Sequence, residues 1–365
     1  MLFRSVRGTA GDEEVAHVIE WSRAQRSIPG HARMRAATVA APNVVEVRDF
    51  DVPAATQPGQ LVVRMLRASV CGSDVHSAFH GFHAEGRLGA PGYPGHEGVG
   101  EVVESRSTRF AEGDLVLTVP VPDFAGCFAE YQLIDEGQVV PVGADADIDR
   151  VLLAQQYGTT LYSMRLFWPQ AGNTGIDNGV AAVIGAGSAG LFFLQQARQL
   201  GFERVVVSDL DADRLAVARS LGAAEIVDAT SASIVDAVDD LTGGKGADLV
   251  IEAAGYDSCR VDAIAAVRSH GTVGCFGFPE GYGLAPFPAN TAFRKVVRIQ
   301  WASGTQNEPG LVAFHDAVRH IREGSIEVDY CLGTNYTLEE VPEALERATA
   351  LGRGAVKMTI DIAGR

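Results

Sequence analysis

The sequence predicts an α/β fold in which a mostly antiparallel β domain accompanies a doubly wound parallel sheet. From residue 34 to about 155, short alternating strands are broken by glycine and proline, a pattern typical of antiparallel sheets. From about 156 to 303, apolar strands alternate with helical segments, which favours a parallel sheet with right-handed crossovers. A glycine-rich turn after the first of these strands favours a nucleotide-binding version of that sheet.

The composition excludes several classes of partner. The 365 residues carry a formal net charge of −16, which argues against nucleic acid and against anionic membrane surfaces. No apolar run is long enough to cross a membrane, and the N-terminus lacks a signal-peptide core. The five scattered cysteines form neither a disulfide framework nor a CxxC pair. We therefore expect a cytoplasmic protein.

The elements follow in order along the chain. Residues 1–33 are polar and irregular, and we expect an N-terminal extension without an assigned function. The β domain is expected to contain strands at residues 34–47, 60–65, 98–104, 113–116 and 128–131. The parallel sheet is expected to contain strands at residues 180–184, 204–207, 224–228, 247–252, 271–277 and 296–299. The tail is expected to form helices at 311–322 and 338–350 and a closing strand at 355–362, which the β domain would host.

The glycine-rich turn has the spacing Gly-x-Gly-x-x-Gly. Gly185 permits a tight turn, Gly187 lets the backbone approach a pyrophosphate, and Gly190 lets the helix pack on the strand. The intervening Ser188 and Ala189 open a helix whose N–H groups and dipole favour phosphate. These five residues are our candidate cofactor loop.

An acidic residue at the end of the next strand indicates which dinucleotide binds. Asp209 lies 19 residues after Gly190, where a carboxylate accepts both adenosine-ribose hydroxyls and repels a 2′-phosphate. This favours NAD over NADP; the alternative is a solvated aspartate at the rim of an ordinary strand-turn-helix. Asp211 and Asp213 compete for the role but lie beyond the strand, and Arg214 either flanks the ribose or lies on the helix surface.

Two loops of the β domain carry potential metal ligands. Cys71 is followed by Asp74, and His96 is followed by Glu97. A thiolate and an imidazole, each beside a carboxylate, suit a zinc site in which carboxylates orient the imidazole or join the ligands. Taken alone, the pair is better explained as a buried thiol and an ordinary loop histidine. The dinucleotide motif elsewhere in the chain favours the metal site.

The chain resembles the zinc-dependent alcohol and polyol dehydrogenases of the medium-chain dehydrogenase/reductase family from about residue 34 to 362. The resemblance rests on four segments, Cys71–His76, Gly92–Glu97, Gly113–Val116 and Gly185–Gly190 with Asp209. It implies a GroES-like catalytic domain at 34–155 completed by 304–365, and a Rossmann NAD-binding domain at 156–303. It also implies a homodimer or homotetramer that pairs through the sheet edge, for which residues 296–299 are the candidate.

The resemblance also implies roles for individual residues. Cys71 and His96 correspond to zinc ligands, and Asp74 to the carboxylate that orients His96. Ser73 corresponds to the hydroxyl that takes the substrate proton; the alternative is that its hydroxyl only stabilises a turn. His76 corresponds to the outer end of a relay through the nicotinamide ribose, or is a surface histidine. Contacts at the nicotinamide end are implied for Thr159, Gly277 and Phe278.

Two departures from the family pattern concern metal. Residues 117–127 occupy the place of the family's four-cysteine lobe but contain one cysteine, so we expect one catalytic zinc and no structural zinc. Gln155 stands at the third ligand position, and an amide is a poorer zinc ligand than a thiolate or carboxylate. Either Glu97 joins Cys71 and His96, or Gln155 coordinates weakly or through water, or the metal is lost.

These features predict an NAD-dependent zinc dehydrogenase that converts a secondary alcohol to a ketone, or the reverse. The resemblance implies a small polar substrate such as a sugar, cyclitol or polyol. A metal-free reductase, or an NAD-using lyase or epimerase on the same fold, is the alternative, and a dinucleotide sensor without catalysis is a third class. Residues 79–83 follow the relay segment and either line the pocket or form a mobile loop.

Overall fold

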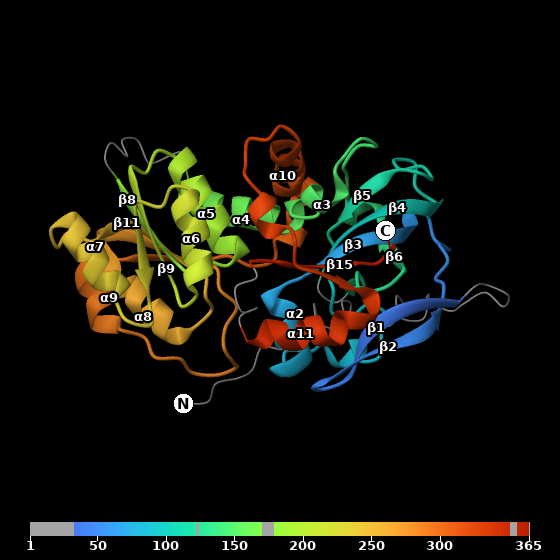
Figure 1. The fold of residues 1–365 in the computed structure, drawn as a ribbon, viewed down its shortest axis with the longest axis horizontal. Helices are drawn as coiled ribbons and strands as arrows, with labels where there is room; N and C mark the ends of the chain where they lie inside the picture. The colour runs from blue at the N-terminus through green and yellow to red at the C-terminus, as the bar shows by residue number, and fades with distance from the viewer. Residues whose placement is uncertain (1–32, 122–123, 170–178, 351–355, 365) are drawn as a thin grey trace, which may run out of the picture.

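The computed structural model describes residues 33–121, 124–169, 179–350 and 356–364. The predicted extension at 1–33 and the first residue of the closing strand predicted at 355–362 therefore lie outside the described residues, apart from Arg33. A parallel sheet with its helices occupies one end of the molecule, and an antiparallel sheet occupies the other (Figure 1). The predicted fold class is confirmed, whereas the domain boundaries stay a prediction.

The parallel sheet has six strands in the order β10-β9-β8-β11-β12-β13. Their bounds are β8 Val180–Ile184, β9 Arg204–Asp209, β10 Glu225–Asp228, β11 Ala247–Glu252, β12 Val267–Cys275 and β13 Arg298–Trp301. The strand order reverses between β8 and β11, so a crevice opens there beyond the carboxyl ends of the strands, where such sheets bind ligands.

Helices cover both faces of this sheet. They are α5 Ser188–Gln199, α6 Ala212–Ser220, α7 Ile234–Thr242, α8 Asp257–Ala266 and α9 Ala289–Lys295. Successive strand residues point to opposite faces. Ala181 and Val183 accordingly join the apolar cluster of α5 and α6, while Val180 and Ala182 join that of α7 and α8. Burial on both faces explains why β8 is continuously apolar and why β9 and β11 have apolar middle residues.

The antiparallel sheet contains the site described below. Its strands are β3 Gln60–Val70, β4 Glu97–Ser105, β5 Leu115–Thr118, β6 Tyr131–Asp135, β7 Val139–Pro141, β14 Asn335–Thr337 and β15 Met358–Asp361. β15 pairs with β3 in antiparallel register, with Met358 opposite Val70. The prediction that the β domain hosts the closing strand is confirmed for these residues, and the C-terminal segment thereby reaches the start of α2.

The prediction of a single first strand was wrong. Residues 34–47 form not one strand but parts of two, β1 Arg33–Ala41 and β2 Val44–Asp51, paired as a hairpin. The turn passes through Pro42 and Asn43, and Asn43 has φ of 65°. Asparagine tolerates this left-handed conformation better than most residues, so the turn signal was present in the sequence.

The remaining helices accompany the antiparallel sheet or lie between the two sheets. They are α2 Gly72–Phe79, α3 Ile148–Val151, α4 Ala154–Phe167, α10 Val312–Arg322 and α11 Val341–Thr349. α4 lies between the sheets and packs on both α5 and α10 (Figure 1). The two predicted tail helices are found as α10 and α11, each preceded by a 3-10 turn, at Pro309–Leu311 and Leu338–Glu340. No helix among the described residues is long and apolar enough to cross a membrane.

Candidate active site

Cys71 stands at the junction between β3 and α2. It follows the last residue of β3 and is the N-cap of α2. Its backbone N–H donates to Asp74 Oδ2 at 2.9 Å, and Asp74 itself is fully buried. Asp74 thus satisfies an N–H at the start of the helix that would otherwise lack a partner, and it fixes the position of the thiol.

His96 directly precedes β4, and Asp74 sets its orientation. His96 Nδ1 lies 2.8 Å from Asp74 Oδ1. Because a carboxylate only accepts, Nδ1 carries the proton and Nε2 is left with its lone pair. Burial on its own would lower the pKa of His96, but the Asp74 carboxylate outweighs this effect. The pKa of His96 is therefore well above the usual 6.5. A cation and a proton would therefore compete for this imidazole.

Glu97 is the first residue of β4, and two neighbours hold one of its carboxylate oxygens. Ser69 Oγ donates to Oε2, and Lys357 Nζ lies 2.6 Å from the same oxygen. Glu97 is 1% exposed and Lys357 5%. Burial raises the pKa of Glu97, but Lys357 and then His96 lower it more, so the net shift is downward. The carboxylate is therefore ionised, with Oε1 free of these two bonds.

Glycines on either side of these two residues allow the strand to pack closely. A Cβ at Gly95 would lie 2.7 Å from the Phe128 ring, and one at Gly98 would lie 2.3 Å from Met65 Cε. Neither position has room for a side chain. The glycines let the segment carrying His96 and Glu97 lie against the core of the antiparallel sheet.

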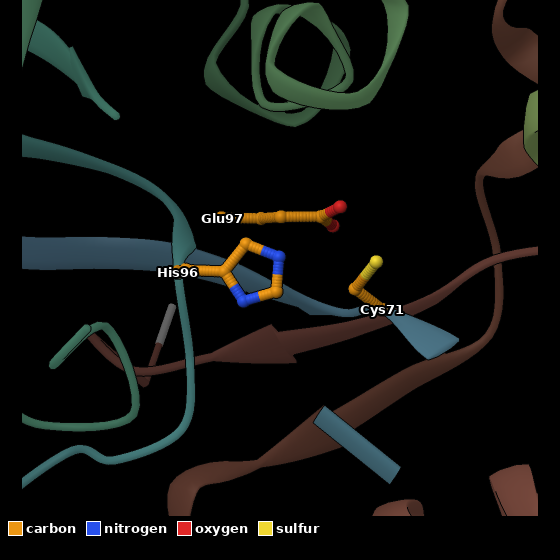
Figure 2. A group of neighbouring side chains, drawn as sticks. All are labelled: Cys71, His96 and Glu97. Carbon is orange, nitrogen blue, oxygen red and sulfur yellow. The ribbon is translucent and has the colours of Figure 1, made fainter. Parts of the chain in front are cut away.

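The three side chains converge (Figure 2). The ligand atoms of Cys71, His96 and Glu97 all lie within 4.8 Å of one another. A thiol sulfur, an imidazole nitrogen whose other nitrogen is held by a carboxylate, and a buried ionised carboxylate form a donor set that zinc prefers. The residues present therefore fit a zinc ion.

Gln155 and Ser73 flank this group. Gln155 is buried in α4, and its Nε2 donates to the backbone oxygen of His96 at 3.4 Å. Ser73 lies in the first turn of α2, with Oγ 3.4 Å from His96 Nε2. Both predicted residues are thus beside the group, although the Gln155 amide nitrogen contacts the backbone of a ligand residue.

His76 lies one turn further along α2. Its Nδ1 is 3.3 Å from Nδ1 of His80, and its ring centroid is 4.8 Å from that of Phe278. Phe278 comes from the segment after β12 of the parallel sheet, whereas α2 follows β3 of the antiparallel sheet. The two parts of the molecule therefore meet at this point. Burial lowers the pKa of His76, and His80 lowers it further. His76 is therefore neutral at neutral pH.

The glycine-rich turn has the conformation that its sequence predicts. Gly185 has φ of 101°, which favours glycine, and a Cβ at Gly190 would lie 1.8 Å from the Gly185 oxygen. A Cβ at Gly187 would meet nothing within 4 Å. Gly185 and Gly190 are thus required by the fold itself, while Gly187 faces open space.

Other predicted cofactor residues surround this turn. Asp209 Oδ2 accepts from the backbone N–H of Ala186 at 2.6 Å, which joins the end of β9 to the turn. Ser188 Oγ bonds to Gln156 on α4, and Ala189 follows it in the first turn of α5. Arg214 lies on α6.

The residues predicted at the nicotinamide end lie on two elements. Thr159 is on α4, and its Oγ1 donates to the backbone oxygen of Gln155 at 3.1 Å. A Cβ at Gly277 would lie 2.2 Å from the Gly255 nitrogen, so this loop tolerates only glycine. Phe278 follows it and is 40% exposed.

Sequence reasoning missed three residues that hold the predicted ones. Lys357 and Ser69 bind Glu97, and Gln156 binds Ser188. Lys357 directly precedes β15 and stands between Val356 and Met358; a lysine between apolar residues was a usable signal, because a buried cation requires a partner. Ser69 and Gln156 carried no comparable signal.

The fold and the donor set together define a zinc-dependent dehydrogenase. The chain matches the models "Zinc-binding dehydrogenase" over residues 189–315 and "Alcohol dehydrogenase GroES-like domain" over residues 57–144. It is 30% identical to the "Probable zinc-binding alcohol dehydrogenase" of Mycobacterium tuberculosis, over 87% of this chain and 86% of that one. It is 21% identical to the sorbitol dehydrogenase of Bacillus subtilis, over 90% of this chain and 97% of that one.

A solved structure shows the same fold. The alcohol dehydrogenase from Thermus sp. superposes with a TM-score of 0.78 at 22% identity, covering 90% of this chain and all of that one. The chain belongs to the zinc-binding alcohol dehydrogenase family. It is a zinc-type alcohol dehydrogenase and therefore an oxidoreductase.

Proposed function

We propose that this protein is an NAD-dependent dehydrogenase that oxidises a secondary alcohol of the sugar, cyclitol or polyol type to a ketone, or catalyses the reverse. The observation that carries the proposal is the convergence of Cys71, His96 and Glu97 within 4.8 Å. A metal held there would polarise the alcohol oxygen and make its proton easier to remove.

The proposed ligands are Cys71 Sγ, His96 Nε2 and Glu97 Oε1. Glu97 is favoured over Gln155 because its carboxylate is ionised and its Oε1 takes no part in the bonds to Ser69 and Lys357, whereas the amide oxygen of Gln155 is a neutral and poorer zinc ligand. Thiolate and carboxylate give the site two negative charges, which suits a divalent ion. We propose one zinc, because residues 117–127 contain a single cysteine and so cannot supply a four-cysteine site.

Helix α2 provides the proposed proton route. Ser73 begins it, close to His96: its hydroxyl accepts the proton released by the substrate and gives up its own proton towards His76. His76 continues it one turn later, and its lowered pKa leaves it neutral and able to accept a proton. Asp74 takes no proton in this scheme but orients His96.

The proposed cofactor is NAD rather than NADP. Asp209 lies at the carboxyl end of β9, beside the glycine-rich turn, and its charge would repel a 2′-phosphate. Gly185, Gly187, Ser188, Ala189 and Gly190 would hold the pyrophosphate, with Arg214 near the ribose. Thr159, Gly277 and Phe278 would border the nicotinamide.

We also propose that the protein forms a homodimer or homotetramer through β13. This strand is the last in the parallel sheet, and its outer edge has no partner among the described residues. Trp301 on it is 54% exposed, and Phe293 on α9 is 83% exposed. An unpaired edge bordered by apolar side chains favours pairing with a second copy.

The test is a screen of NAD reduction over sugars, polyols and cyclitols, with and without a chelator, alongside metal analysis. We expect one zinc per chain, turnover with a member of these classes, and loss of turnover on chelation that zinc restores. Full activity with near-zero zinc would instead support the metal-free alternative. Binding of NAD without turnover of any alcohol would support a dinucleotide sensor.

A further inference from the structure

Two histidines on α2 form a pair that leads from the site towards solvent. His76 and His80 are four residues apart, so they lie on the same face of the helix. Their Nδ1 atoms are 3.3 Å apart, and their rings meet edge to face with centroids 4.8 Å apart. His76 is half-buried, whereas His80, the C-cap of the helix, is exposed.

The surroundings of His76 leave it few routes for a proton. Phe82 and Phe278 contact its ring with centroids 5.5 and 4.8 Å away, and neither can accept a proton. Helix α11 packs on α2 through the apolar residues Val341, Ala344 and Leu345. Among the described residues, the titratable group that acts on His76 is His80.

The geometry points to His80 as the proton outlet of the active site, receiving at Nδ1 the proton that His76 releases from its own Nδ1. This inference rests on the proposed function, in which each alcohol oxidised releases one proton. A hydrogen bond between two Nδ1 atoms holds one proton, so one ring donates and the other accepts.

The transfer balances without any change of oxidation state at the histidines. His76 gains a proton at Nε2 and gives its Nδ1 proton to His80, which then loses its Nε2 proton to water or buffer. The net reaction is alcohol plus NAD⁺ to ketone, NADH and one proton. The two rings return to their starting tautomers by exchange with solvent.

The test compares the wild type with His80→Phe and His80→Asn. Phenylalanine keeps an aromatic ring beside His76 but accepts no proton, and asparagine keeps polarity without titrating. His315→Phe is the matched control, because His315 is an exposed histidine on α10, apart from this site. His80 is exposed, so we expect both His80 variants to fold.

The first measurement is an NMR titration of the histidines in the cofactor-free protein. We expect the pKa of His76 in the wild type to lie below the usual 6.5. In His80→Asn the pKa of His76 should rise, because the neighbour that lowers it is gone. An unchanged His76 titration would overturn the pairing, whatever the enzyme's activity.

The second measurement is turnover in weak buffer at neutral pH. We expect kcat of His80→Phe to fall about tenfold with little change in KM, the solvent isotope effect to rise, and added imidazole to restore the rate. His315→Phe should behave as the wild type. Wild-type rates in His80→Phe without an imidazole response would overturn the outlet alone. Absence of turnover in the wild type would overturn the proposed function and the outlet with it.

Discussion

Replacing Lys357 by methionine removes one charge of a buried ion pair and keeps most of the side-chain volume. Lys357 Nζ is 2.6 Å from Glu97 Oε2, and both residues are almost fully buried. Removing one partner leaves a buried charge without its counter-ion, which costs about 3–5 kcal/mol. Ser69 would remain as the donor to Glu97. We therefore expect Lys357→Met to lose about 3–5 kcal/mol in the free energy of unfolding of the zinc-free protein.

Zinc should recover part of this loss. If Glu97 binds the ion, the charge of the metal replaces the charge of the missing ammonium. Lys357→Met should therefore bind zinc more tightly than the wild type, and the gain in binding free energy should equal the unfolding free energy that zinc restores. The double variant with Glu97→Gln removes both charges and should be more stable than the single variant without zinc. Arg33→Met, which breaks the exposed pair with Asp51, is the control and should cost less than about 1 kcal/mol.

The pH dependence has a defined sign. The folded-state pKa of Glu97 is lowered from 4.5, so its contribution is present above pH 4.5 and is lost as the pH falls through the lower folded value. The folded-state pKa of Lys357 is raised from 10.5, so its contribution is present below pH 10.5 and is lost as the pH rises through the higher folded value. Without Lys357 the pKa of Glu97 should rise, because burial is then opposed less, so the difference between wild type and Lys357→Met should shrink as the pH falls and Glu97 of the variant takes up a proton.

Urea unfolding of the zinc-free and zinc-loaded proteins measures these quantities. A Lys357→Met variant within about 1 kcal/mol of the wild type without zinc would refute the reasoning, because that is the range of exposed pairs. A double variant no more stable than the single one would do the same.

Four further substitutions test the site. Asp74→Asn should weaken zinc binding about 10–100-fold in a chelator competition, because the amide does not hold the His96 tautomer as a carboxylate does; unchanged affinity would contradict its orienting role. Gly190→Ala should lower the thermal midpoint, since its Cβ meets the Gly185 oxygen, whereas Gly187→Ala should keep it and weaken only NAD binding in a titration. Asp209→Asn keeps an acceptor for Ala186 but removes the charge, so the ratio of kcat/KM for NAD⁺ over NADP⁺ should fall about tenfold; an unchanged ratio would exclude Asp209 as the selector.

Local patterns predicted much of the fold because they depend on nearby residues alone. The apolar run of β8 follows from burial on two faces, and the positive φ of Gly185 follows from a tight turn. Residues 34–47 of this hairpin were predicted as one strand because apolar residues lie on both sides of a turn that occupies only Pro42 and Asn43. Apolar patterning outweighed the short turn signal there.

The sequence by itself determined the class of fold, the nucleotide-binding turn and the two loops that carry Cys71 and His96, since each is encoded in a contiguous segment. Only the tertiary structure decided what surrounds Glu97. Lys357 reaches it because β15 pairs with β3, and no local spacing connects residues so far apart in the chain. Long-range pairing thus selects which carboxylate oxygen is held and which is left for a cation.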